Sequence, residues 1–100
     1  MIKISTQFTT SPGPRLIKDG PFSGELFREK YLIPLLKKET KTIIIDLDDT
    51  DGYAACFLQE AFGNLQKQFP NINLNDKFKF ISRQEESLVQ EIKTYIIENQ

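Results

Sequence analysis

Four aspartates in the middle of the chain have the residue type and the spacing that active sites and recognition loops use. They follow an apolar run of isoleucines and precede a glycine and an amphipathic stretch, and they are Asp46, Asp48, Asp49 and Asp51. In α/β proteins, sites form where the carboxyl end of a strand meets the start of a helix. The pattern is typical either of an aspartate-based phosphotransfer site or of a recognition loop without catalysis.

The phosphotransfer interpretation depends on one motif. The segment from Asp46 to Thr50 resembles the first motif of haloacid-dehalogenase-type phosphatases, in which Asp-x-Asp-x-Thr follows an apolar strand. The resemblance implies that Asp46 is the nucleophile, that Asp48 protonates the leaving group and that Mg²⁺ bridges carboxylate and phosphate. The second motif of these phosphatases is a strand that ends in serine or threonine, and Ser82 would end that strand here. A metal-binding acidic pair should then follow a further strand, but the acidic residues beyond Ser82 fall on an expected helix: Glu85, Glu86, Glu91 and Glu98.

The spacing of the acidic segment excludes a calcium loop of the EF-hand type. Such a loop needs acidic ligands at alternate positions, glycine at the sixth position and glutamate at the twelfth. If Gly52 is sixth, Leu47 is first and Leu58 is twelfth, and neither side chain can bind calcium. We therefore expect a domain with no metal site and no cofactor, and the phosphatase remains the alternative.

The composition narrows the class of protein further. A chain of 100 residues predicts one domain, 1–100, and its formal net charge of −1 predicts no nucleic-acid partner. The chain has no histidine, so the commonest general base and the His metal ligands are missing. No apolar run is long enough to span a membrane, and the amino end leads into an expected strand and not into a signal peptide. We therefore expect a cytoplasmic protein.

Hydrophobic periodicity predicts alternating strands and helices, which is an α/β pattern. A period of two over residues 2–8 predicts a first strand with a small antiparallel partner, and the run at 42–47 predicts a central strand covered on both faces. The other expected elements are a short strand at 15–18, helices at 24–39, 57–69 and 85–98, a loop at 70–76 and a strand at 77–82. Pro34 should distort the first helix. This order predicts a mainly parallel sheet of about three to five strands with about three main helices.

Two sequence blocks occur together in this chain, and their combination is a more specific signal of a protein family than either block alone. The first is Ser23 followed by Gly-Glu-Leu-Phe-Arg-Glu, with Pro-Arg at 14–15 and Asp-Gly at 19–20 before it. The second is Ile-Asp-Leu-Asp at 45–48, followed by Gly-Tyr-Ala-Ala-Cys-Phe-Leu-Gln-Glu-Ala-Phe-Gly-Asn-Leu at 52–65. Together they resemble the STAS-like domain family of unknown function, over residues 13–66. The resemblance implies a small α/β domain of a bacterial and phage group, related in fold to anti-sigma factor antagonists, that acts by binding.

The resemblance also implies where regulation would act. In the antagonists, a partner kinase that is also an anti-sigma factor phosphorylates a serine at the start of a helix, which adds a charge of about −1.5 to −2. In the STAS-like family this helix opens with Gly-Tyr-x-Ser-Ser-Phe. Ala55 and Cys56 occupy the two serine positions here. The chain should therefore be fixed in its unphosphorylated form and should bind a partner constitutively.

These observations lead us to expect a non-catalytic, regulatory interaction domain whose partner is a protein, such as a histidine-kinase-type ATPase. The expected contact surface lies around residues 48–57 and consists of Asp48, Asp49, Asp51, Gly52, Tyr53, Ala55, Cys56 and Gln59. Ser23 should cap a helix. Arg15 and Arg28 should either pair with the acidic loop or remain surface charges. We also expect the four carboxylates to be solvated and Cys56 to be a small buried residue.

Overall fold

The sheet of this protein is parallel, with the isoleucine-rich strand in the middle. The computed structural model describes residues 1–98 and orders the strands β1 (Ile2–Lys3), β2 (Ile43–Asp46) and β3 (Phe78–Ile81) as β1-β2-β3. Both pairings are parallel, and Ile45 of β2 lies opposite Ile2 on one side and Phe80 on the other. The predicted α/β class and parallel sheet are confirmed. The expected antiparallel partner of the first strand is wrong for the part of the chain that the structure describes.

The first long helical segment begins at a side-chain cap and is interrupted by one π-helical turn. It consists of α2 (Gly24–Phe27), the π-helical turn η2 (Arg28–Leu32) and α3 (Ile33–Lys38). Ser23 caps α2, because its hydroxyl oxygen accepts a hydrogen bond from the backbone N–H of Leu26 at 3.0 Å. Pro34 lies in the first turn of α3, directly after the wide turn. Proline lacks an N–H and crowds the preceding turn, so the wide turn is the irregularity expected there.

The second long helical segment follows β2 and lies against the first. It consists of α4 (Ala55–Leu58), η3 (Gln59–Gly63), which is again π-helical, and α5 (Leu65–Gln68). The two segments approach so closely at Gly24 that a Cβ atom on this residue would lie 2.4 Å from the carbonyl oxygen of Phe57. A residue without a side chain is therefore required at this crossing.

The remaining helical elements are short except for the last. They are α1 (Ile4–Gln7), the 3₁₀ turn η1 (Ile17–Asp19), α6 (Leu74–Lys77) and α7 (Ser87–Glu98). Two sequence expectations are wrong here, because residues 15–18 enter a 3₁₀ turn and not a strand, and the expected loop at 70–76 contains the start of α6. Asn73 explains α6, since its side chain accepts a hydrogen bond from the N–H of Asn75.

The first strand is much shorter than the alternation of apolar residues predicts. After Lys3 the chain turns into α1, and the N–H groups of Phe8 and Thr9 both donate to the carbonyl oxygen of Ile4 at 2.9 Å. The N–H of Lys3 donates to Oε1 of Gln7 at 2.7 Å. These local hydrogen bonds satisfy the backbone without a partner strand, so the prediction of a strand over 2–8 is wrong beyond Lys3.

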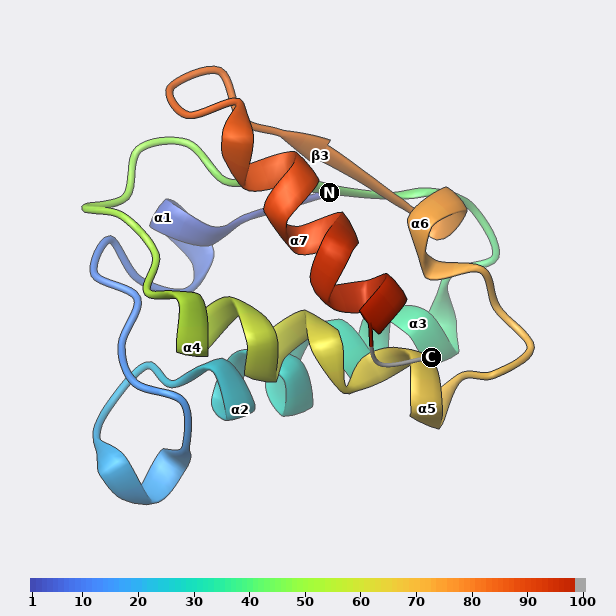
Figure 1. The fold of residues 1–100 in the computed structure, drawn as a ribbon, viewed down its shortest axis with the longest axis horizontal. Coiled ribbons are helices and arrows are strands. Elements are labelled where there is room, and N and C mark those ends of the chain that lie inside the picture. The colour runs from blue at the N-terminus through green and yellow to red at the C-terminus, as the bar shows by residue number, and fades with distance from the viewer. Residues whose placement is uncertain (99–100) are drawn as a thin grey trace.

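The long helices cover one face of the sheet (Figure 1), where they lie below β3 in the view shown, and α7 packs across η3. Ile43 and Ile45 point into this core and are 3% and 0% exposed. On the opposite face Ile44 is half-buried, and its neighbour on β3, Lys79, is exposed. The expectation of a sheet covered on both faces is therefore wrong, because the connecting helices return on the same side.

Candidate functional site

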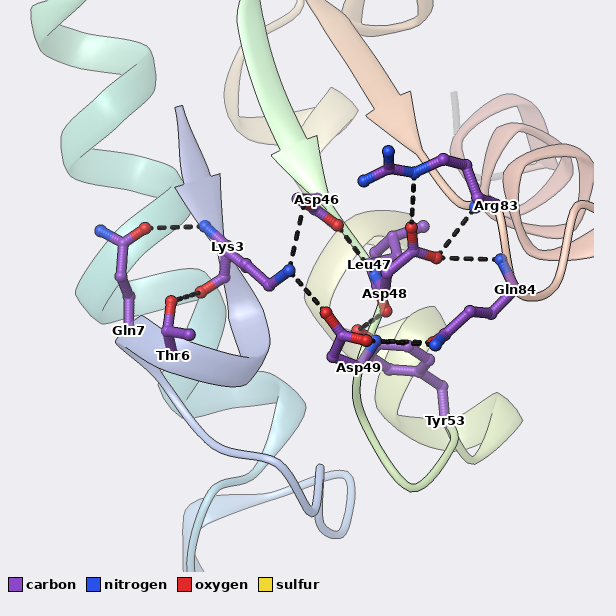
Figure 2. A network of polar contacts seen from close by, with 10 residues as sticks. All are labelled: Lys3, Thr6, Gln7, Asp46, Leu47, Asp48, Asp49, Tyr53, Arg83 and Gln84. Atoms are coloured by element: carbon purple, nitrogen blue, oxygen red, sulfur yellow. Dashed lines mark hydrogen bonds and ion pairs between the residues drawn. The ribbon is translucent and has the colours of Figure 1, made fainter.

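The carboxyl end of β2 places Asp46 beside β1, as the parallel register requires. Asp46 is the last residue of β2 and lies opposite Lys3. Its Oδ2 lies 3.7 Å from Nζ of Lys3, and its Oδ1 accepts a hydrogen bond from the N–H of Asp48 at 3.0 Å. Asp46 is only 5% exposed. Figure 2 shows that its carboxylate points into a network of polar side chains and not into solvent.

Asp48 connects this end of β2 to the segment that follows β3. One of its carboxylate oxygens accepts hydrogen bonds from the N–H groups of Arg83 and Gln84, at 2.9 Å and 3.1 Å, and the other accepts from Nε of Arg83 at 3.2 Å. The hydrogen bond from the Gln84 backbone, with those from Arg83, holds the pKa of Asp48 below its usual range, although burial opposes this. Asp48 is 5% exposed. It is therefore a buried connector, which corrects the expectation of a solvated contact residue.

Asp49 is exposed but has close partners on both sides. Its backbone lies in the left-handed region, with φ of 70°. Nζ of Lys3 donates to Oδ2 at 2.7 Å, which lowers the pKa of Asp49 and raises that of Lys3. Gln84 is the partner on the other side. Its Oε1 accepts a hydrogen bond from the N–H of Asp49 at 2.7 Å, and its Nε2 donates one to Oδ1 of Asp49 at 3.1 Å. These contacts explain how a non-glycine residue is held in this conformation.

The tip of the loop is fixed to the segment that precedes the first long helix. The N–H of Asp51 donates to the carbonyl oxygen of Thr10 at 2.8 Å, and Ser11 donates its hydroxyl to the Asp51 carboxylate at 2.6 Å. Gly52 has φ of 123°, a conformation that other residues rarely adopt. A Cβ atom on Gly52 would have no atom within 4 Å, so conformation and not space requires the glycine.

Tyr53 ties the loop to the core. Its hydroxyl donates to the carbonyl oxygen of Leu47 at 2.9 Å, and its ring lies 6.0 Å from that of Phe57. Burial raises the pKa of Tyr53 to about 12. The Tyr53 ring therefore packs against the core, and only its exposed part is available to a partner.

The start of α4 is the open part of the site. Ala54 and Ala55 are exposed, and no side chain caps the helix. Cys56 is half-buried, so the expectation of a buried cysteine is wrong. Gln59, one turn further along, is also half-buried, and its Oε1 accepts from Nη2 of Arg15 at 2.7 Å. The surface here is formed by small side chains above a rigid loop.

Arg15 and Arg28 pair with Glu60 and not with the acidic loop. Nη1 of Arg28 lies 2.5 Å from Oε2 of Glu60 and also donates to its carbonyl oxygen at 2.6 Å. Nη1 of Arg15 lies 3.5 Å from Oε1 of the same carboxylate. Of the two expectations, pairing with the loop is wrong, and Arg28, which is 7% exposed, is not a surface charge either. Glu60 joins both long helical segments, and sequence reasoning did not single it out.

Three further residues of the network, Lys3, Arg83 and Gln84, were not among the predicted site residues. A parallel sheet brings the carboxyl ends of its strands together at one edge, and these residues lie at the end of β1 and just after β3. Applying that rule to the expected strand at 77–82 would have placed Arg83 and Gln84 beside the aspartates. Lys3 lies inside the expected first strand at 2–8, so the rule would not have found it. Within residues 1–98, no group of three or more His, Cys, Asp or Glu side chains is arranged to hold a metal ion.

The fold and the site define an α/β domain in which a rigid acidic loop leads into an exposed helix start. The family model that matches the chain is described as a STAS-like domain of unknown function, and the match covers residues 23–88. The match includes both long helical segments and the acidic loop, so the chain belongs to this family. No curated protein and no solved structure matches the chain significantly. None of the described helices is long and apolar enough to cross a membrane.

Proposed function

We propose that this protein is a cytoplasmic, non-catalytic interaction domain with a regulatory role, and that it binds a protein partner through the start of α4. The proposed contact residues are exposed or half-buried, and they are Asp51, Gly52, Tyr53, Ala54, Ala55, Cys56 and Gln59. Asp48 and Asp49 support this surface, because their hydrogen bonds fix the loop that leads into the helix. A histidine-kinase-type ATPase is the partner class that we favour.

The exposed helix start carries the proposal. Ala54 and Ala55 leave the backbone accessible, and no capping side chain covers the first turn. The loop before it is held by hydrogen bonds from three other segments, at Thr10, Lys3 and Gln84. A surface that is rigid before binding loses little conformational entropy when a partner docks. These properties suit recognition of a protein surface.

The same contacts weigh against the phosphatase alternative. A general acid needs a raised pKa so that it holds a proton at neutral pH, whereas the pKa of Asp48 is lowered. All the hydrogen bonds that Asp48 accepts come from Arg83 and Gln84, which leaves it poorly placed to donate to a leaving group. Asp46 accepts a backbone hydrogen bond and faces Lys3.

A magnesium titration separates the two functions. We expect the thermal midpoint of the protein to be unchanged by Mg²⁺, since a ligand of the folded state must raise stability. We also expect no hydrolysis of an aryl phosphate in the presence of Mg²⁺. Turnover that disappears in Asp46→Asn would restore the phosphatase hypothesis.

The interaction itself is tested with variants at Cys56. Wild type, Cys56→Ser and Cys56→Glu are immobilised and used to recover partners from an extract of the source cells. The serine adds little volume or charge and should recover the same partners. The glutamate should recover less, because its longer, charged side chain blocks close packing of a partner against the helix start, while the helix dipole keeps the fold stable. Equal recovery by all three proteins, with equal circular dichroism, would move the contact surface elsewhere.

A further inference from the structure

Two adjoining hollows lie at the end of the molecule where β2 and β3 begin. Their volumes are about 510 Å³ and about 370 Å³, and Asn71, Ile72 and Asn73 line both of them. The other lining residues come from α5 and the turn after it, from the segment before β2 and from α6, and they are Gln66, Lys67, Pro70, Thr40, Lys41, Thr42, Asp76 and Lys77. Each hollow has the size of a small-molecule site, which is usually about 300–1,000 Å³.

The stretch of chain that both hollows share is held in place by a buried side chain. Gln66 is only 7% exposed. Its Nε2 donates to the carbonyl oxygens of Phe69 and Ile72, at 3.0 Å and 2.6 Å, and its Oε1 accepts from the N–H of Leu74 at 3.3 Å. Residues 69–74 are therefore ordered before any ligand binds, so binding carries little cost for ordering this part of the chain.

The charged side chains that line the hollows are mostly basic. They are three lysines, Lys41, Lys67 and Lys77, and one carboxylate, Asp76. None of the four forms an ion pair within the described residues. Three positive charges against one negative charge leave the lining with a net charge of +2. Nζ of Lys77 is also fixed in position, because it donates to the carbonyl oxygen of Glu39 at 2.8 Å.

Neutral hydrogen-bonding groups and an apolar surface accompany the lysines. The side chains of Thr40, Thr42 and Asn71 make no hydrogen bond within residues 1–98. Pro70 and Ile72 supply the apolar part of the first hollow. Lysine binds phosphate as a point charge, and hydroxyl and amide groups donate to its oxygens. A phosphate monoester carries a charge of about −1.5 to −2 at neutral pH, which balances the lining.

The opposite end of the sheet is unsuited to an anion. Asp46, Asp48 and Asp49 lie there, and the cations beside them, Lys3 and Arg83, already pair with these carboxylates. Figure 1 shows that α3, α5 and α6 gather at one end of the molecule, whereas the acidic loop before α4 lies at the other. The charge of the molecule is thus polarised along the strands, and a small anion is attracted to the end that carries the hollows.

We propose that the two hollows form one binding site for a small phosphate monoester. The phosphate group lies beside the lysines, and the apolar part of the ligand packs against Pro70 and Ile72. The site is separate from the start of α4, so this inference goes beyond the proposed function and does not rest on it.

Phenyl phosphate is the probe, because it joins one phosphate group to one apolar ring. It is titrated without Mg²⁺ into the isotope-labelled full chain, and amide chemical shifts locate the binding. Phenyl sulfate has a similar shape with one negative charge fewer, and isophthalate has two carboxylates in place of the phosphate. The variants are Lys41→Gln and Lys67→Gln. The matched control is Lys18→Gln, which also removes an exposed lysine but lies on η1. Thermal unfolding confirms that each variant is folded.

We expect saturable shifts at residues 40–42 and 66–77, with a Kd of about 1 mM or lower, as befits a ligand of so few atoms. Lys41→Gln and Lys67→Gln should each bind phenyl phosphate about threefold more weakly, and Lys18→Gln should bind it as wild type does. Phenyl sulfate should bind wild type about threefold more weakly than phenyl phosphate.

Four results would overturn the inference. They are the absence of saturable shifts, shifts at all exposed lysines alike, an equal loss of affinity in Lys18→Gln, and equal affinity for phenyl sulfate or isophthalate. Shifts confined to residues 48–57 would also overturn it, because they would place the anion at the start of α4. None of these results bears on whether a protein partner binds there, which the Cys56 variants test.

Discussion

Asp48 shows how a carboxylate with the sequence context of a catalytic acid becomes a structural connector. It accepts three hydrogen bonds from the segment after β3, and its side chain is buried at the end of β2. The donors are two backbone N–H groups and one guanidinium, all of which favour the ionised form. The charge on Asp48 therefore helps to hold the acidic loop to the β3–α7 connection, together with the two hydrogen bonds between Asp49 and Gln84.

This arrangement predicts acid-sensitive stability. The pKa of Asp48 is lower in the folded protein than its unfolded value of about 3.9, so the unfolded state binds more protons as the pH falls through that value. The contribution of Asp48 is complete above about pH 5 and is lost as the pH falls below about 4. Asp48→Asn should lower the thermal midpoint at pH 7 and flatten the fall in stability between about pH 5 and pH 2. Asp19→Asn, which removes an exposed carboxylate, is the control and should follow wild type.

Glu60 is predicted to matter more for stability than any residue of the acidic loop. Its side chain is 12% exposed, and that of its partner Arg28 is 8% exposed. Removing Glu60 leaves the buried Arg28 with the exposed carboxylate of Glu29, 3.6 Å away, as its remaining ion-pair partner, so Glu60→Ala should lower the free energy of unfolding by about 3 kcal/mol. The Arg15 side chain is 41% exposed, and Arg15→Ala should cost less than about 1 kcal/mol. Urea unfolding of both variants checks the difference, and similar losses would contradict the proposed role of Glu60.

At the scale of elements, the two long helical segments depend on a close crossing at Gly24. A Cβ atom there would lie 2.4 Å from the Phe57 carbonyl oxygen and 3.2 Å from Cβ of Glu60. Because the first of these atoms belongs to the backbone, it cannot move away without displacing α4. The crossing therefore sets the distance between α2 and the helix that carries the proposed contact surface.

Gly24→Ala should consequently destabilise the protein even though alanine is the better helix former. We expect a loss of about 1–3 kcal/mol in the free energy of unfolding, which is the usual cost of overpacking. Gly52→Ala is the informative comparison, since that site has open space and only an unusual φ. It should cost about 1–3 kcal/mol from backbone strain, and it should change the loop while leaving the α2–α4 contact intact. Amide chemical shifts of α2 that move in Gly52→Ala and not in Gly24→Ala would contradict this explanation.

The two faces of β2 should respond differently to truncation. Ile45 is fully buried between β1 and β3, and Ile45→Ala should cost about 2–5 kcal/mol. Ile44 is half-buried on the open face, so Ile44→Ala should cost less, about 1 kcal/mol. Denaturant unfolding of the pair tests the one-sided sheet, and equal losses would indicate that the second face is covered.

For the whole molecule, the sequence predicts what repeats along the chain and misses what depends on distant contacts. β2 and the long helices follow from a β-branched run, from periodic apolar residues and from the cap at Ser23. The end of the first strand depends on the side chain of Gln7, which periodicity does not register. The partners of Arg15 and Arg28 depend on how two helical segments cross, and Gly24, which that crossing requires, does not by itself reveal which side chains meet there.

The short strand β1 has a consequence for the behaviour of the protein at high concentration. Edge strands with free backbone groups recruit strands from other molecules, which is a common route to aggregation. Here the N–H of Lys3 is already engaged by the side chain of Gln7, and α1 begins at the next residue. A strand from another molecule would find few free backbone groups to pair with at this edge, so the short β1 protects the sheet from being extended there.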